Sequence, residues 1–259
     1  MFHQIRCYLS FLIHSTTKYG VHSPFVYDLL TKCLNKKTNT NNIQILKKYK
    51  KELLKNNTKI KIKDFGAGSR VLNPHERKIS NIAKTAGTSI KKAQFLMHLV
   101  NYFKIENSLE IGTSLGIATL GMSLGNPKIK ITTLEGCSET LKVAKQKFQK
   151  LKITNTQFIE GNFEKTLAKT IQNNKYNLIY FDGNHTKKAT INYFEQCLPT
   201  VYNDSIFIFD DIYWSSGMTD AWQYIKNHKK VTITIDMFYW GIVFFRKEQQ
   251  EKEHFKIRI

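Results

Sequence analysis

Glycines and acidic residues in the middle of the chain have the types and spacing of a ligand-binding turn. Glu110, Gly112 and Gly116 stand between two apolar runs, which indicates a strand end, a tight turn and a helix start. Glu135 closes the next strand-like run, 23 residues after Gly112 (135 − 112 = 23). A gap of roughly 20 residues is expected when an acid at the end of a second strand binds a ribose. The pattern predicts a site for a cofactor that contains adenosine.

The glycine spacing separates two such cofactors. Dinucleotide sites favour G-x-G-x-x-G, in which a middle glycine lets the backbone approach a pyrophosphate. This chain has E-x-G-x-x-x-G and lacks that glycine. S-adenosylmethionine carries no phosphate; it needs a close backbone approach for its amino-acid tail and a carboxylate for its ribose hydroxyls. The sequence therefore predicts S-adenosylmethionine. The predicted cofactor contacts at this turn and acid are Glu110, Gly112, Thr113, Ser114, Gly116, Glu135 and Gly136.

Acidic residues also follow two later strand-like runs. Asp182 directly follows residues 176–181, and Asp210 and Asp211 directly follow residues 205–209. Ligands of open parallel sheets bind beyond the carboxyl ends of the strands, so we expect these acids in the cofactor's crevice. Neighbouring carboxylates repel one another unless they are protonated or bridged by a cation, and oxygen ligands favour Mg²⁺. The three aspartates are therefore the predicted ligands of a divalent metal, which would lower the pKa of a substrate hydroxyl.

His185 lies beside the first of these acids and is the predicted general base, with Asp182 as its catalytic neighbour. Structural roles are the alternative for all of these residues. Asp182 would then form a turn, His185 would cap a helix, and Asp210 with Asp211 would cap the region Trp214–Asn227.

The elements that must position these residues alternate regularly from residue 105 onward. Strand-like and helix-like runs follow each other, which predicts an α/β fold with a parallel sheet covered on both faces. Two final strand-like runs have no helix between them, so the last strand is expected to be antiparallel. The predicted strands are 108–111, 129–134, 156–159, 176–181, 205–209, 231–235 and 242–245. Helices are expected at 2–16, 24–34 and 43–54, and the segments predicted are a mainly helical extension or lid (1–104), a cofactor-binding domain (105–247) and a charged tail (248–259).

Over residues 105–246 the chain resembles the class I S-adenosylmethionine-dependent methyltransferases, which implies their Rossmann-like seven-stranded sheet. Within them it is most similar to small-molecule O-methyltransferases of the catechol type and to bacterial relatives acting on sugars or polyketides. Glu110, Gly112 and Gly116 match the first family motif, and Glu135 matches the ribose acid. The resemblance implies methyl transfer to a small hydroxylated acceptor. Catechol-type enzymes have Asn where this chain has Asp211, whereas the sugar-type relatives use two acids there.

The family usually places an acidic or amide group for the adenine after the third strand, where this chain has Asn162. An asparagine amide can donate and accept, which suits the adenine edge. A cap of the helix that starts at Phe163 is the alternative role for Asn162, and the sequence favours neither. Asp182 is also counted among the residues that contact the cofactor.

The charge balance is strongly basic, with 40 Lys and Arg against 20 Asp and Glu. This favours anionic partners in general and raises an RNA methyltransferase as an alternative function. Nucleic-acid enzymes that modify amines carry an Asn/Asp-Pro-Pro-aromatic turn after strand four, where this chain has residues 182–185, Asp-Gly-Asn-His. Nucleic acid is therefore not favoured as a partner. A binding protein that kept the fold without catalysis is a further alternative, which the intact cofactor motif opposes.

The remaining features concern location and partners. The four cysteines are far apart in sequence, which indicates neither a zinc site nor a disulfide framework and favours the cytoplasm. The N-terminal run of residues 1–15 is too short and polar to span a bilayer. A homodimer is left open. The glycine-rich segment from Asp64 to Ser69 is expected to be a loop outside the main sheet, either a lid or an ordinary turn.

Overall fold

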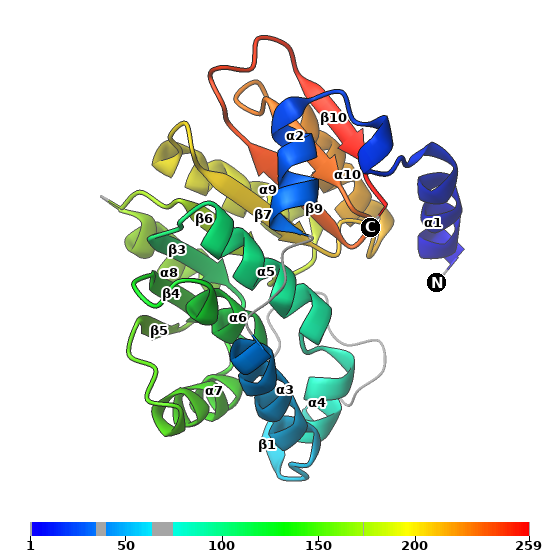
Figure 1. Cartoon of the computed structure of the whole chain (residues 1–259). Coiled ribbons are helices and arrows are strands. Elements are labelled where there is room, and N and C mark those ends of the chain that lie inside the picture. Colours follow the sequence, from blue (N-terminus) through cyan, green and yellow to red (C-terminus); the bar gives the residue numbers. More distant parts are fainter. Residues whose placement is uncertain (1, 35–39, 64–74, 173, 259) are drawn as a thin grey trace. The chain divides into compact units, whose positions relative to one another are not determined.

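The computed structural model describes residues 2–34, 40–63, 75–172 and 174–258 (Figure 1). The chain divides into two compact units: unit 1 comprises Met1–Thr31 and Leu167–Ile259, and unit 2 comprises Lys32–Thr166. The chain is of the α/β class, as the alternating strand-like and helix-like runs predict. The limits of these units differ from those of the segments predicted from motif order, because the units are defined by spatial contacts and the segments by sequence. The glycine segment that starts at Asp64 lies outside the described residues.

Unit 2 contains three parallel strands of the eight-stranded sheet, in the order β3-β4-β5. Their bounds are β3 (Asn107–Ile111), β4 (Lys130–Glu135) and β5 (Thr156–Glu160), with α6 (Ile117–Gly125) and α7 (Ser138–Lys150) as the connecting helices and α8 (Phe163–Ile171) after β5. Ile111 pairs in register with Leu134, and Glu135 pairs with Glu160. The carboxyl ends of all three strands therefore meet at one edge, where the predicted cofactor residues stand.

The rest of unit 2 consists of helices and a separate hairpin that packs beside them. The helices are α3 (Thr40–Leu54), α4 (Ile79–Thr85) and α5 (Ile90–Tyr102), and the antiparallel pair is β1 (Lys59–Lys61) with β2 (Glu76–Lys78). On α3, Leu46, Tyr49 and Leu53 are buried at helical spacing and join a core with Leu115 and Phe148. The segment around residue 60 is thus outside the main sheet, as predicted, although part of it is a strand.

Unit 1 contains five strands of the eight-stranded sheet, in the order β10-β8-β9-β7-β6. The strands are β6 (Leu178–Phe181), β7 (Ile206–Asp210), β8 (Ile233–Asp236), β9 (Trp240–Phe244) and β10 (Glu253–Lys256). β9 is antiparallel to both β7 and β8, which confirms the reversal predicted for the seventh strand. β10 pairs parallel with β8 inside the segment predicted as a charged tail. A hydrogen bond of 2.8 Å between Thr234 Oγ1 and His254 Nδ1 supports that pairing.

The helices of unit 1 include the two that the sequence predicts at the N-terminus. They are α1 (Phe2–His14), α2 (Pro24–Asp28), which continues as a π-helical turn over Leu29–Cys33, α9 (Lys187–Cys197) and α10 (Ser216–Asn227). α1 packs through its aromatic residues, since the rings of Tyr8 and Phe11 lie 4.9 and 5.7 Å from the ring of Phe238. Within the described residues, no helix is long and apolar enough to cross a membrane.

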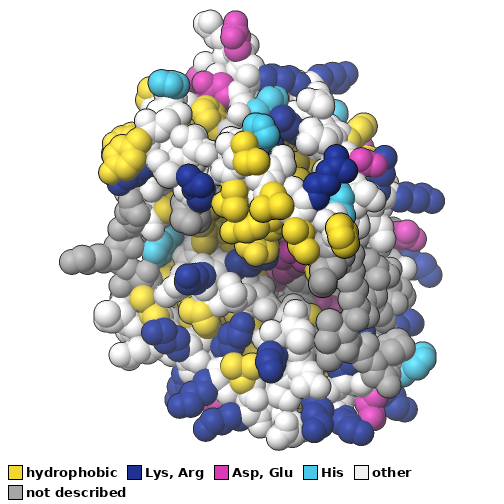
Figure 2. Space-filling model, turned by 90° about the vertical axis from the view of Figure 1, so that its right-hand side faces the viewer, with side chains coloured by type: hydrophobic (Ala, Val, Ile, Leu, Met, Phe, Trp, Pro, Cys, Tyr) yellow, Lys and Arg dark blue, Asp and Glu magenta, His cyan; other side chains and the backbone are white. Residues whose placement is uncertain are grey.

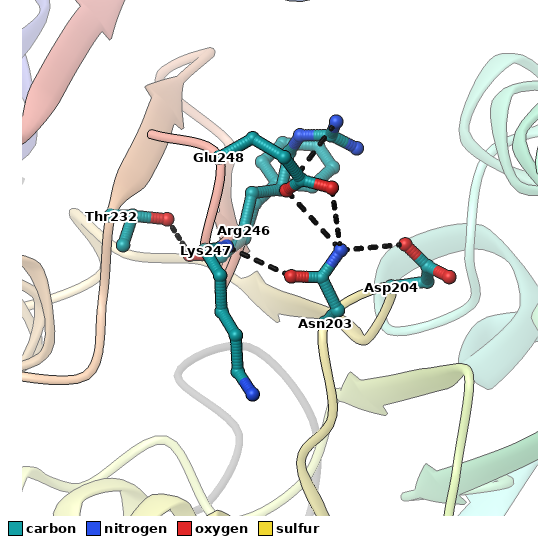
Figure 3. A network of polar contacts seen from close by, with 7 residues as sticks. Asn203, Asp204, Thr232, Arg246, Lys247 and Glu248 are labelled. Carbon is teal, nitrogen blue, oxygen red and sulfur yellow. Dashed lines mark hydrogen bonds and ion pairs between the residues drawn. The ribbon is translucent and has the colours of Figure 1, made fainter. Parts of the chain in front are cut away.

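A network of polar contacts joins the loop before β7 to the segment after β9 (Figure 3). Asn203 Nδ2 donates to both carboxylate oxygens of Glu248 at 2.9 and 3.2 Å, and Asn203 Oδ1 accepts from Lys247 N at 2.8 Å. Arg246 lies 3.7 Å from Glu248 and 4.3 Å from the centre of the Phe25 ring. These contacts are mostly exposed, so they order the chain locally and add little to stability.

Candidate functional site

The glycine turn after β3 has an unusual backbone. Gly112, Ser114 and Gly116 have positive φ angles of 106°, 49° and 75°. Backbone N–H groups of Gly112 and Thr113 donate to the carbonyl of Leu134 at 2.9 and 3.1 Å, which ties the turn to the end of β4. α6 starts directly after Gly116. The predicted strand, turn and helix are therefore present, and glycine suits two of the three left-handed positions.

Glu135 stands beside this turn, as its spacing predicts. Its Oε2 accepts from the backbone N–H of Ser114 at 2.7 Å, and its Oε1 accepts from the N–H of Cys137 at 2.9 Å. The carboxylate is thereby oriented at the carboxyl edge of the sheet, with Gly136 next to it. An ionised carboxylate has about four lone-pair sites, more than these two backbone bonds occupy.

Glu110 lies beneath the turn and is fully buried. Its Oε2 accepts from the hydroxyls of Thr119 and Thr133, each at 2.5 Å, and Thr113 Oγ1 lies 2.5 Å from Thr133 Oγ1. Burial raises the pKa of Glu110 to about 8, against the two hydroxyl donors, which lower it. Its Oε1 has no hydrogen-bond partner among the described residues. A buried oxygen in this state fits a polar group of a ligand, such as the ammonium of an amino-acid tail.

Gly116 has close protein neighbours, and its contact with the cofactor stays a prediction. A Cβ built on it would lie 3.0 Å from the hydroxyl oxygen of Tyr49 and 3.1 Å from the ring of Phe148. The missing side chain therefore makes room for protein packing. Tyr49 also donates a hydrogen bond of 2.7 Å to the carbonyl of Leu115. Tyr49 could not be predicted as a partner of the turn, because its place on the apolar face of α3 indicates burial but not the partner.

Asn162 has the geometry of its alternative role. Its Oδ1 accepts from the backbone N–H of Glu164 at 3.0 Å, at the start of α8. This is a helix cap. The contact with adenine stays a prediction.

The acid and base that follow β6 are neighbours in unit 1. Asp182 Oδ2 accepts from the hydroxyl of Tyr180 at 3.1 Å, and Oδ1 lies 3.7 Å from Nε2 of His185. The side chain of His185 is 24% exposed, so solvent or a ligand can reach it. Thr186 accepts from Ala189 N and caps α9, so the helix does not use His185 as its cap.

Asp210 and Asp211, at the end of β7, differ in burial and in backbone conformation. Asp210 is the last residue of β7 and is buried, whereas Asp211 has a φ of 53° and donates its N–H to the carbonyl of Tyr239 at 2.8 Å. Ser215 caps α10 by accepting from Met218 N, which excludes the predicted capping alternative for both aspartates.

The predicted metal ligands do not form a ligand group. Over the described ranges, which include Asp182, Asp210 and Asp211, no three His, Cys, Asp or Glu side chains are arranged to hold a metal ion. Binding of Mg²⁺ by these aspartates therefore stays a prediction from the sequence. Spacing along the sequence brings acids to one edge of a sheet, but φ and side-chain direction decide whether their oxygens converge.

The glycine turn and its acids belong to unit 2, and the Asp182–His185 pair belongs to unit 1. An α/β fold with a glycine turn after one strand and an oriented acid after the next defines a class of protein, the class I S-adenosylmethionine-dependent methyltransferases. An O-methyltransferase family model matches residues 70–240, more than half of the chain. The chain belongs to the O-methyltransferase family.

Solved structures of methyltransferases have a similar fold. The SAH-bound methyltransferase PaMTH1 from Podospora anserina is 14% identical with a TM-score of 0.62, over 88% of this chain and 97% of that chain. An O-methyltransferase from Bacillus cereus in complex with SAH is 17% identical with a TM-score of 0.54, over 85% and 97%. The SAM-bound O-methyltransferase TomG from Streptomyces achromogenes is 14% identical with a TM-score of 0.54, over 62% and 82%. None of the curated proteins matches the chain.

Proposed function

We propose that the protein transfers a methyl group from S-adenosylmethionine to a hydroxyl oxygen of a small acceptor. The observation that carries the proposal is the bond from Ser114 N to Glu135 Oε2, which holds the acid beside the glycine turn. The unpartnered, buried Oε1 of Glu110 supports a ligand at the same turn. Membership of the O-methyltransferase family supports oxygen as the atom that is methylated.

Within this proposal each residue of the turn has a role. Glu135 accepts the ribose hydroxyls, and the ammonium of the amino-acid tail favours the ionised form of Glu110, so that Oε1 accepts from it. The positive φ angles let the backbone approach the ligand closely. The other proposed contacts to the cofactor are Gly112, Thr113, Ser114, Gly136, Asn162 and Asp182. Gly116 acts indirectly, because it allows Tyr49 to pack against the turn.

His185 is the proposed base. The bound cofactor supplies an electrophilic methyl group on a sulfonium. When the acceptor oxygen takes up that methyl group, Nδ1 of His185 would accept the proton that the hydroxyl loses. Nε2 of the same ring lies 3.7 Å from Asp182, so the carboxylate orients the imidazole and stabilises the charge that it gains.

Metal assistance by Mg²⁺ stays a prediction from the sequence, and no step above depends on it. The prediction requires methyl transfer to stop when EDTA is added and to return when Mg²⁺ is restored. Methyl transfer that continues unchanged in EDTA contradicts it.

The proposed partner is a small molecule and the proposed location is the cytoplasm. All four cysteines are free, which suits a reducing compartment. An RNA substrate is not favoured. Methyl incorporation into RNA but into no member of a panel of small phenols, sugars and hydroxylated polyketides would replace the proposal with that alternative.

Cofactor binding can be tested without an acceptor. We expect Glu135→Gln to weaken S-adenosylmethionine binding by about tenfold in calorimetry, since a good hydrogen bond to a charged group contributes about 1.5–3 kcal/mol. Glu160→Gln is the matched control, because Glu160 pairs with Glu135 in the adjacent strand but is exposed. Equal affinities of both variants, or no binding by the unmodified protein, would contradict the proposed site.

A further inference from the structure

A groove in unit 2 lies apart from the glycine turn. One face of α7 forms its first wall, and residues 56–60 with the start of α4 form the second. Its volume is about 410 Å³, in the range of small-ligand sites. The buried side chains of Ile60 and Ile79 and the half-buried Val143 form an apolar floor. We call this feature the α7 groove.

Lysines line the rim of the α7 groove. The rim lysines on α7 are Lys142, Lys147 and Lys150. The last lies eight positions after the first, which is a rise of about 12 Å along the helix. Glu52 holds Lys147 at 2.5 Å and lies 3.8 Å from Lys150. The carboxylate among the lining residues is Glu139. Lys142 and Lys150 are exposed and can turn toward a ligand in the groove.

The rest of unit 2 adds to the positive charge of these lysines. Residues 32–166 contain 26 Lys and Arg against 9 Asp and Glu, a net +17, whereas unit 1 has 14 against 11, a net +3. The basic character of the chain is thus concentrated in the unit that carries the groove. Figure 2 shows Lys and Arg side chains spread over the lower part of one face of the molecule. Such a field attracts phosphates and concentrates them at the surface.

We propose that the α7 groove binds a nucleotide, with its base over the isoleucine floor and its phosphate at Lys142 and Lys150. The lining combines an apolar floor with lysines at the rim. This suits a ligand that has a flat ring and an anionic group, and a nucleotide has both. A free mononucleotide and one unit of a single RNA strand share this chemistry. This site is separate from the cofactor turn and does not depend on the acceptor.

Fluorescence anisotropy on the full chain tests the proposal with two probes, labelled AMP and a labelled single-stranded oligouridylate. We expect the double variant Lys142→Glu, Lys150→Glu to lose at least tenfold in affinity for the probe that binds. The control Lys128→Glu, Lys130→Glu changes two exposed lysines of the same unit by the same charge outside the groove, and we expect a loss below threefold. For the strand, losing the contact to this one phosphate should also reduce the slope of log affinity against log salt by about 0.7.

The two probes identify the source of the nucleotide. Binding of AMP that the Lys142→Glu, Lys150→Glu variant loses assigns the groove to a free nucleotide, and binding of the oligonucleotide alone with the same loss assigns it to RNA. Equal losses in both double variants would show general charge attraction and overturn the proposal. If neither probe binds to the unmodified protein, the proposal is also overturned.

Discussion

Glu110 has a folded-state pKa of about 8, raised by burial, whereas a free glutamate titrates near 4.5. Between these values the folded state keeps a proton that the unfolded state has released. A pKa raised on folding gives stability that is full below about pH 4.5 and is lost as the pH rises through 8. For one proton the slope is about 1.4 kcal/mol per pH unit.

We expect Glu110→Gln to remove this pH dependence, because an amide of the same shape does not titrate. Urea unfolding without cofactor measures it at pH 5.5 and 7.5. The unmodified protein should lose about 2–3 kcal/mol more than the variant over that interval. Glu160→Gln, which retains Glu110, should keep the original slope. A Glu110→Gln slope equal to that of the unmodified protein would show that Glu110 is ionised when folded.

Gly116 has a positive φ of 75° and close neighbours, so a side chain there meets two obstacles. We expect Gly116→Ala to lower the free energy of unfolding by about 2 kcal/mol, because left-handed backbone costs 1–2 kcal/mol for a residue with a Cβ and because Tyr49 must move. The control is Gly217→Ala, where the nearest atom lies 3.4 Å from the new Cβ. Urea unfolding of both variants gives the comparison, and equal stabilities would contradict the packing role of Gly116.

At the residue scale, the sequence predicted those contacts that local spacing determines. Glu135 lies beside the turn because its strand is parallel to β3, and that could be inferred from alternating runs. Asn162 shows the limit, because an amide one residue before a helix fits a ligand and a cap equally well until the bond to Glu164 N is seen. The metal prediction was of the same kind for Asp182, Asp210 and Asp211: the acids are adjacent in topology, but their side chains do not converge.

At the scale of elements, α3 is the helix that supports the cofactor turn. Burial raises the pKa of Tyr49, so its hydroxyl stays protonated and donates to Leu115. We expect Tyr49→Phe to keep the packing against Phe148 but to leave the Leu115 carbonyl unpaired, at a cost of about 1–3 kcal/mol. Affinity for S-adenosylmethionine should fall several-fold, because the turn is less firmly held.

Calorimetry and thermal unfolding check this expectation. Tyr224→Phe is the control, since it removes an exposed hydroxyl that donates to Glu195 in unit 1. Cofactor affinity that is unchanged in Tyr49→Phe would show that α3 stabilises unit 2 without positioning the turn.

The predicted helices and strands are correct where hydrophobic periodicity and turn residues indicate the same element. The expected helix at 43–54 is α3 (Thr40–Leu54), and the expected strand at 156–159 is β5 (Thr156–Glu160). β10 was missed because its residues Glu253–Lys256 are mostly polar, and its pairing with β8 supplies the structure that propensity does not. Long-range pairing of this kind cannot be read from a single short segment.

At the scale of the whole molecule, the uneven charge bears on self-association. Unit 2 carries a net +17, whereas unit 1 carries +3, so two copies approach at a lower electrostatic cost through unit 1. That unit also exposes apolar side chains on one face of α1, and Figure 2 shows hydrophobic side chains gathered on the face that carries this helix. The exposed fractions are 91% for Phe2, 51% for Ile5, 56% for Leu9 and 77% for Ile13.

We therefore expect a homodimer in which the exposed face of α1 packs against a second copy. α1 has no acidic residue and only Arg6 as a fully charged side chain, so little charge must be desolvated. Leu9→Lys with Ile13→Lys should give a monomer in sedimentation velocity with unchanged thermal stability, because both side chains point away from the core. Leu54→Lys with Leu151→Lys, which places the same charges on exposed apolar positions of unit 2, should remain dimeric. A monomeric unmodified protein, or a dimer that survives the α1 substitutions, would assign the apolar face of α1 to some role other than self-association.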